Sequence, residues 1–445
     1  MVSYLDTEDV IVAQCTPAGA SAVNIIRVSG PELGSLYKIL TKSKKNPTPN
    51  TILYKNIYIN SAKLDSVLVS YFKGPNSFTG EDVVEINCHG GDIISKNIIS
   101  KMIEAEYARH ALPGEFSFRA YSSGKIDVLQ AESINELVGS QTNVFTNKTM
   151  ENLDGVLSTK IKDIKKRIVL LSTEAEYDLD IDEEELDAYS YKNMKKQINE
   201  IIEEIDGISS CSLYSNIIKD GVRVAIVGKP NVGKSTMFNY LLGFNRSIVS
   251  NMAGTTRDAV EAILEISGYR VVLIDTAGCW KSNEEIERVG IQKTKEEVER
   301  ADMVLFLGEN KTDLKLIKEL NIKKDLITIL SKCDINKSKE YNISISSNNG
   351  VGFKELLTAL STKIEANVSK DVAGSKYYIN KRQQIVLDEL LHKMNFIITQ
   401  IDGLVEKDII ATLIKDLVDT LNEIINPINK EEIINNIFSS FCVGK

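Results

Sequence analysis

The sequence predicts a mixed architecture, α/β plus all-α, in which a doubly wound sheet is inserted into a helical domain that follows an N-terminal α+β domain. Three observations support this prediction. Residues 228–236, Gly-Lys-Pro-Asn-Val-Gly-Lys-Ser-Thr, fit the phosphate-binding pattern G-x-x-x-x-G-K-[ST]. After this loop, apolar runs typical of buried strands alternate with helical segments up to about residue 368. Long stretches with helical periodicity flank that region on both sides.

Length and composition indicate a multidomain protein of the cytoplasm. A chain of 445 residues suggests roughly three domains. No run of 18 apolar residues occurs, so no membrane span is expected, and the N-terminus lacks a signal-peptide pattern. The six cysteines are scattered without a C-x-x-C pair, which argues against a zinc site or a disulfide framework. A net charge of −9 predicts that any RNA contact is transient or shared with a partner.

The N-terminal domain is expected over residues 1–118 as an α+β unit. Short runs with alternating or continuous apolar residues predict its strands, and a helix is expected to follow a Gly-Gly pair. The predicted strands are 10–14, 22–28, 53–59, 66–72 and 82–91, and the predicted helix is 92–107.

The helical domain is expected in two parts, residues 119–217 and 371–445. Apolar residues at helical spacing over 126–144 and 147–213 predict antiparallel helices, as do those over 385–391 and 409–425. The acidic run 174–187 is interpreted as a solvated face or loop rather than a cation site.

The inserted domain is expected over residues 218–370. Five apolar runs predict the strands of a doubly wound sheet, with the phosphate loop directly after the first of them. These runs are 222–227, 271–274, 303–307, 326–330 and 343–345.

The phosphate loop predicts a nucleotide site. Its glycines let the backbone wrap around a phosphate, and the amides at the following helix N-terminus face the anion. Lys234 can neutralise the β- and γ-phosphate oxygens, and Ser235 is placed to ligate Mg²⁺.

Two further segments are expected to complete the phosphate site. Asp275-Thr-Ala-Gly278 follows a strand about 40 residues after the phosphate loop, so Asp275 can reach Mg²⁺ through water and the Gly278 amide can sense a γ-phosphate. Thr256, in the segment 253–258, can complete the Mg²⁺ shell.

A third segment predicts guanine recognition. Asp334, after the strand that ends at Leu330, can accept hydrogen bonds from the guanine N1 and N2 edge, and the Lys332 stem can pack over the base. Ser331 stands where GTPases usually have Asn, which puts nucleotide affinity in doubt. Ser346 and Ser347 are expected to offer a backbone contact to guanine O6.

The residues expected to bind GTP all lie in these loops. They are Asn231, Val232, Gly233, Lys234, Ser235, Thr236, Ser250, Asn251, Met252, Ala253, Gly254, Thr255, Thr256, Asp275, Thr276, Ala277, Gly278, Ser331, Lys332, Asp334, Ser346 and Ser347.

The residue that positions the attacking water is less obvious. Ras-like enzymes place Gln after the D-x-x-G segment, whereas this chain has Cys279 followed by Trp280. A carboxylate further along must take this role, and Glu284, Glu285 and Glu287 are available.

The motifs resemble those of a known family. The order of the phosphate loop, Ala253-Gly-Thr-Thr-Arg-Asp258 and Asp275-Thr-Ala-Gly278 resembles the bacterial Era-like GTPases, and the flanks resemble the tRNA modification GTPases MnmE, also called TrmE. The matching stretches, which bring the resemblance to nearly the whole chain, are Ile11–Pro17, Pro75–Val83, Leu112–Ala120 and the terminal Phe438-Ser-Ser-Phe-Cys-Val-Gly-Lys445.

The resemblance implies a fold and an activity. The N-terminal domain would bind a tetrahydrofolate derivative, in its 5-formyl or 5,10-methylene form, and form a homodimer. With a flavin-containing MnmG partner, the family adds a carboxymethylaminomethyl-type group to C5 of the wobble uridine of certain tRNAs, and the folate supplies the one-carbon unit.

The resemblance also implies roles for individual residues. K⁺ would be bound by Asn231, Ser250, Met252 through its carbonyl, and Thr255, and Glu287 would orient water. Folate would be bound by Arg27, Glu85, Lys125 and Lys445, which by themselves read as ordinary surface charges. Cys442 is a candidate for the modification chemistry, although a free cysteine near an apolar helix is as readily explained by packing.

Two alternatives stay open. An Era-like switch in ribosome assembly would carry a basic or K-homology RNA-binding appendage, which the acidic helical flanks do not suggest. A GTPase scaffold with weakened guanine binding would follow if Ser331 lowers affinity.

Overall fold

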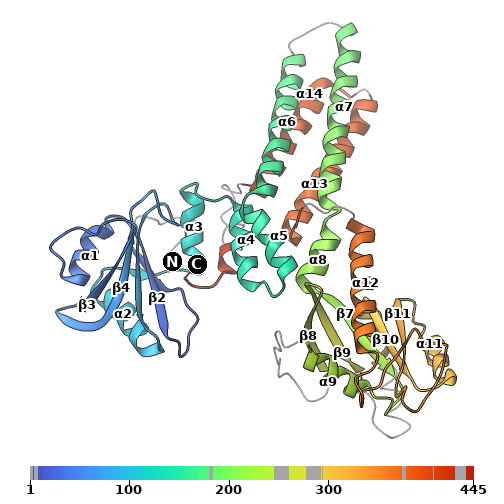
Figure 1. Cartoon of the computed structure of the whole chain (residues 1–445). Helices are drawn as coiled ribbons and strands as arrows, with labels where there is room; N and C mark the ends of the chain where they lie inside the picture. Colours follow the sequence, from blue (N-terminus) through green and yellow to red (C-terminus); the bar gives the residue numbers. More distant parts are fainter. Residues whose placement is uncertain are drawn as a thin grey trace. The chain divides into compact units, whose positions relative to one another are not determined.

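The computed structural model describes residue 4 and residues 9–179, 184–244, 260–276, 292, 294–372, 377–403, 405–425 and 437–444. The chain forms two compact units, one of residues 1–136, 152–183 and 403–445 and the other of residues 137–151 and 184–402 (Figure 1). None of the helices in the described ranges has the length and apolarity that a bilayer crossing requires.

The first unit begins with a six-stranded sheet in the order β3-β4-β5-β2-β1-β6. All neighbours are antiparallel except the β1–β6 pair. Its strands are β1 (Ile11–Gln14), β2 (Val23–Gly30), β3 (Thr51–Ile59), β4 (Ala62–Phe72), β5 (Asp82–His89) and β6 (Arg109–His110). The helices that follow or interrupt these strands are α1 (Leu33–Thr41), α2 (Asp92–Glu104) and α3 (Glu115–Ser122).

Strand alternation gives this sheet two different faces. Val12, Ile26 and Val28 point into a core completed by apolar residues of α1 and α2. The alternate residues Ile11 and Ala13 instead contact Phe116 of α3 on the opposite face. This second face carries two of the predicted folate residues, Arg27 and Glu85.

Long helices form the rest of both units. Helix α6 (Val156–Leu179) packs with α14 (Lys407–Ile425), and α7 (Glu184–Ser209) packs with α13 (Lys381–Asp402). Each pair joins a helix that precedes the second sheet in the sequence to one that follows it, as an inserted domain requires. The remaining helices of this part are α4 (Val128–Gly139), α5 (Asn143–Leu153) and α8 (Ser212–Asp220).

The second sheet has the order β12-β11-β10-β7-β9-β8, and only β8 is antiparallel to its neighbour. Its strands are β7 (Val222–Gly228), β8 (Val260–Ile266), β9 (Tyr269–Asp275), β10 (Met303–Gly308), β11 (Asp325–Leu330) and β12 (Ile343–Ser344). The helical segments between and after them are α9 (Lys234–Phe244), the 3₁₀ turn η2 (Lys311–Leu314), α11 (Lys315–Glu319) and α12 (Phe353–Val372).

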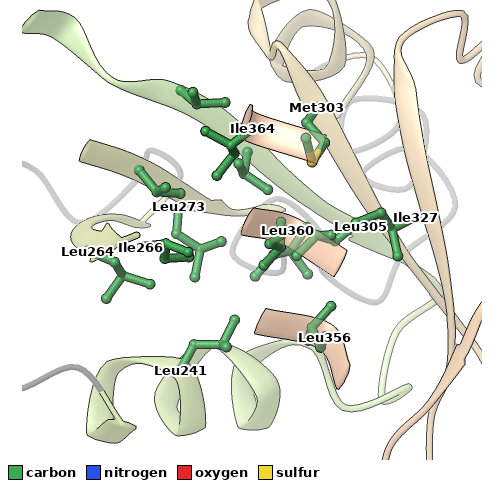
Figure 2. Close-up of a cluster of buried hydrophobic side chains, with 14 of the residues drawn as sticks. Leu241, Leu264, Ile266, Leu273, Met303, Leu305, Ile327, Leu356, Leu360 and Ile364 are labelled. Atoms are coloured by element: carbon green, nitrogen blue, oxygen red, sulfur yellow. The ribbon is translucent and has the colours of Figure 1, made fainter. Parts of the chain in front are cut away.

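Figure 2 shows the core on one face of this sheet, where Leu241 of α9 and Leu356, Leu360 and Ile364 of α12 pack against strand residues such as Leu305. A second cluster, which includes Leu316 and Leu320, covers the other face. Helices on both faces of a mostly parallel sheet confirm the predicted doubly wound class.

The predicted strands of both sheets are present, with shifted ends. The expected helix 92–107 ends at Glu104, and the expected strand 82–91 ends at His89. The helical stretch 147–213 breaks at Gly155, whose φ is 89°, and again at the loop before α8. The described parts of the acidic run 174–187 continue α6 and begin α7, and Glu174 and Glu176 are exposed. The sequence analysis missed α1, α3, β6 and the antiparallel β8.

Candidate functional sites

The phosphate loop connects β7 to α9 and leaves no room for larger residues. A Cβ on Gly228 would lie 2.4 Å from the Leu307 carbonyl oxygen, so the loop can follow this path only with glycine there. Asn231 and Gly233 both have left-handed backbones, with φ of 62° and 98°. The turn therefore has the backbone conformation that lets successive amides converge on an anion.

Lys234 is buried at the start of α9, with 4% of its surface exposed. Its Nζ donates to the carbonyl oxygens of Gly228 and Lys229, both at 2.8 Å. Burial lowers its pKa to about 8, although Asp275 opposes this shift. A bound phosphate would stabilise the ammonium form that burial disfavours.

Two oxygen ligands suited to Mg²⁺ lie side by side at this loop. The Ser235 hydroxyl donates to Asp275 Oδ2 at 2.8 Å. Asp275 is buried at the end of β9, and the Thr276 hydroxyl is held by the Ile226 carbonyl at 2.6 Å. A hydroxyl beside a carboxylate fits a hard cation that prefers oxygen.

The guanine segment contacts the phosphate loop. Lys332 lies 2.6 Å from Glu309 Oε1, and its Nζ donates to the Asn231 carbonyl at 3.3 Å. Ser331 is buried next to the phosphate loop. If Gly233 had a Cβ, that atom would be 3.1 Å from Ser331 Oγ. The predicted guanine and phosphate residues therefore form one continuous site.

Asp334 and Ser346 also come together beyond β11. The Ser346 hydroxyl is the main cause that lowers the pKa of the exposed Asp334 carboxyl, so this side chain is ionised at neutral pH. The Ser346 backbone N–H donates to the Val351 carbonyl at 3.1 Å, which fixes the loop that also carries Ser347. Val232 packs into the core below the phosphate loop, whereas Thr236 is exposed.

The predicted folate residues Arg27 and Glu85 are partners across β2 and β5. They are paired in register, and Arg27 Nε donates to Glu85 Oε1 at 2.9 Å. The Arg27 guanidinium carbon lies 5.4 Å from the ring centre of Phe78 and 5.6 Å from that of Phe116. A carboxylate paired with a guanidinium that contacts two aromatic rings suits a flat heterocycle that carries N–H donors.

Lys125 and the C-terminal segment lie around the same sheet face. Lys125 lies close to Gly80, in the loop that carries Phe78: if Gly80 had a Cβ, that atom would be 3.6 Å from Lys125 Cγ. Gly444 accepts a hydrogen bond from the Cys15 thiol at 3.1 Å, and the exposed Cys442 accepts one from the Gly114 N–H at 3.3 Å. Three predicted folate residues and the end of the chain therefore share one face of the first unit.

Several predicted site residues lie outside the described residues. They are Ser250, Asn251, Met252, Ala253, Gly254, Thr255, Thr256, Ala277, Gly278, Glu287 and Lys445, together with Cys279, Trp280, Glu284 and Glu285.

Comparisons with known proteins assign the family. The family model for the N-terminus of the GTP-binding protein TrmE matches residues 10–125. The family model for the MnmE helical domain matches residues 128–442. A tRNA modification GTPase MnmE from Acetivibrio thermocellus is 34% identical over 98% of this chain and 99% of its own length. Its counterpart from Aquifex aeolicus is 35% identical over the same shares. The chain belongs to the MnmE family of tRNA modification GTPases.

The MnmE helical match begins before the phosphate-loop sheet and ends after it, which agrees with the insertion. Among solved structures, Aquifex aeolicus Era bound to GDP and AlF₄⁻ is 29% identical over 32% of this chain and 56% of its own, with a TM-score of 0.26. The family resemblance deduced from the motifs is confirmed.

The sequence analysis missed residues that shape the folate face. Phe78 and Phe116 flank Arg27, although both belong to stretches that carry the MnmE resemblance. A buried network holds the Phe78 loop: Ser29 donates to Glu81 Oε2 at 2.7 Å, and Glu81 accepts from Arg119 at 3.1 Å. The only sequence signal for this network was the run Ser77-Phe-Thr-Gly-Glu81 itself.

Proposed function

We propose that this chain is a potassium-dependent GTP hydrolase that acts with an MnmG-like flavoprotein to add a carboxymethylaminomethyl-type group to C5 of the wobble uridine of certain tRNAs. A tetrahydrofolate derivative would supply the one-carbon unit. The observation that carries the proposal is that one chain of the MnmE family has both a phosphate loop in contact with Lys332 of the predicted guanine segment and an Arg27–Glu85 pair on the sheet whose β1 end is contacted by Gly444.

For GTP hydrolysis, Lys234 would supply positive charge to the phosphates, and Ser235, Thr256 and Asp275 would hold Mg²⁺, which would neutralise phosphate charge. Asn231 supplies a K⁺ ligand from its left-handed position in the loop. Ser250, the Met252 carbonyl and Thr255 are the proposed remaining K⁺ ligands, and Glu287 is the proposed water-orienting base. K⁺ would supply the positive charge that an arginine finger supplies elsewhere.

For folate binding, the Glu85 carboxylate would accept hydrogen bonds from N–H groups of the pterin, and Arg27 would stabilise this carboxylate while Phe78 and Phe116 would exclude water. Lys125 and Lys445 are placed to pair with carboxylates of the folate tail. Cys442 is the proposed participant in the modification chemistry. The segments 1–118, 119–217, 218–370 and 371–445 would act as a folate and dimerisation domain, the first helical part, the GTPase domain and the second helical part.

In this proposal the protein works in the cytoplasm as a homodimer through its N-terminal domain. tRNA binding is transient and shared with the flavoprotein, because the net charge of −9 does not favour autonomous RNA binding.

Binding of 5-formyltetrahydrofolate tests the proposal. The full chain should bind at micromolar concentration, and a form that lacks residues 441–445 should not. Glu85→Gln should weaken binding at least tenfold, because loss of one charge-assisted hydrogen bond costs about 1.5–3 kcal/mol. Glu104→Gln, on the exposed end of α2, is the matched control and should bind as the wild type does.

If no form binds, the folate assignment is wrong and an Era-like switch in ribosome assembly becomes the better explanation. Equal binding by the full and the truncated chain would exclude the role of Lys445.

A further inference from the structure

The C-terminal segment is anchored by aromatic packing only up to Phe441. Phe438 and Phe441 belong to a buried cluster with Tyr4, Phe118 and Tyr121. Beyond this cluster Cys442 and Val443 are exposed, so apolar burial does not hold the last residues in place. Their position must come from specific contacts.

Three contacts hold residues 442–444. The Gly114 N–H donates to the Cys442 carbonyl at 3.3 Å, and Val443 forms an antiparallel bridge with Pro113. The Cys15 thiol donates to the Gly444 carbonyl at 3.1 Å, across 429 positions of the chain. Only the last of these contacts reaches the main sheet.

Gly444 fits its position because it has no side chain. Its φ is +100°, a conformation that other residues rarely adopt. A Cβ there would lie 2.4 Å from the Gln14 carbonyl oxygen and 3.1 Å from Cys15 Cα. The segment therefore lies directly against the end of β1.

Cys15 belongs to the face that carries the folate residues. Ala13 is paired with Arg27, which is paired with Glu85, so these three residues form one row across the sheet. Cys15 follows Ala13 by two positions and so points to the same face. Burial raises the pKa of the Cys15 thiol. The Arg27 charge lowers this pKa and the Glu85 charge raises it, but both effects are smaller than that of burial. The sulfur therefore keeps its proton at neutral pH and can donate.

We propose that Cys15 is a positioning residue of the folate site: its thiol holds the Gly444 carbonyl, so that the last residues of the chain are fixed beside Arg27 and Glu85. The thiol acts through Gly444 and does not contact the folate itself. This role rests on the proposed folate site. It gives a role to the polar contact that holds Gly444 beyond the aromatic cluster.

Hydrogen exchange on the full-length protein tests the contact without any ligand. In Cys15→Ala, peptides that cover residues 112–116 and 437–444 should exchange about fivefold faster, which corresponds to about 1 kcal/mol. Cys15→Ser keeps a donor and should restore protection. Cys88→Ala is the control, because Cys88 donates to the Asn24 carbonyl in the same sheet but faces the opposite core.

Affinity for 5-formyltetrahydrofolate then tests the consequence. Cys15→Ala should bind about fivefold more weakly than wild type, and Cys15→Ser and Cys88→Ala should bind with wild-type affinity. Gly444→Ala should lose more affinity than Cys15→Ala, because its Cβ cannot be accommodated.

The outcomes separate this inference from the proposed function. Unchanged exchange and affinity in Cys15→Ala would overturn the positioning role and leave the folate site intact. The role would also be wrong if Cys15→Ser failed to rescue both readouts. Faster exchange without folate binding in any form, wild type included, would keep the contact but refute the folate site and with it the positioning role.

Discussion

Replacement of Lys234 by Met should stabilise the nucleotide-free protein while it abolishes nucleotide binding. Burial shifts the pKa of Lys234 from 10.5 to about 8, and a shift of this size corresponds to about 3 kcal/mol of destabilisation at neutral pH. Loss of Nζ removes its hydrogen bonds to the Gly228 and Lys229 carbonyls. Each lost hydrogen bond destabilises the folded protein by about 1 kcal/mol. The net gain is about 1 kcal/mol, or a rise in Tm of about 2–4 °C for a domain of this size.

The pH dependence of stability follows from the same shift. Between about pH 8 and 10.5 the unfolded chain holds a proton on Lys234 that the folded chain has released. The unfolded state then binds more protons, so stability rises with pH in this window. Below about pH 8 both states are protonated and the destabilisation is constant. Lys234→Met should lack this rise.

Calorimetry of the nucleotide-free full chain between pH 7 and 10 measures both effects. Lys229→Met is the control, because it removes the ion pair of Lys229 with the buried Asp313 at 2.8 Å and should lower Tm. A lower Tm for Lys234→Met than for the wild type at pH 7, or the same rise of Tm with pH in both, would show that the buried ammonium does not destabilise the empty loop.

Three further predictions follow from the described contacts. Ser331→Asn should tighten GDP binding about fivefold in titration calorimetry, because an amide adds a hydrogen bond close to Gly233; unchanged affinity would remove the idea that Ser331 weakens guanine binding. Arg119→Leu should lower the free energy of unfolding by about 3 kcal/mol in a denaturant titration, since it leaves the buried Glu115 without one of its cations; a change below about 1 kcal/mol would contradict this. Asn231→Ala should slow GTP hydrolysis at least tenfold in K⁺. It should have little effect in Na⁺, because the wild-type protein should already be slow there. Equal slowing in both salts would argue against Asn231 as a K⁺ ligand.

Strands β7, β9 and β10 could be predicted because their apolar runs are mostly buried, as is typical of strands covered on both faces. β8 was missed because Glu261 and Glu265 interrupt its apolar run, as suits an antiparallel strand at the edge of the sheet. α1 was missed although Leu33, Leu36, Tyr37 and Leu40 have helical spacing, because only nine residues carry the pattern.

The folate face was harder to predict for a physical reason. Glu115 and Arg119 of α3 are almost fully buried, whereas such residues are expected at the surface unless they are paired. Two partners of Arg119, Asp9 and Glu81, lie far from it in the sequence, as Gly444 does from Cys15. No local pattern encodes these contacts, and the four folate residues came from the family resemblance alone.

Transfer of labelled carbon from folate to tRNA would test the proposed activity as a whole. The purified protein, an MnmG-like flavoprotein, tRNA and GTP would be incubated with 5,10-methylenetetrahydrofolate labelled at the methylene carbon, in K⁺ or in Na⁺. The account predicts label on the wobble uridine in K⁺ with GTP, and little label in Na⁺ or with a non-hydrolysable GTP analogue. Hydrolysis of GTP in K⁺ without label in the tRNA, in the presence of an active flavoprotein, would contradict it.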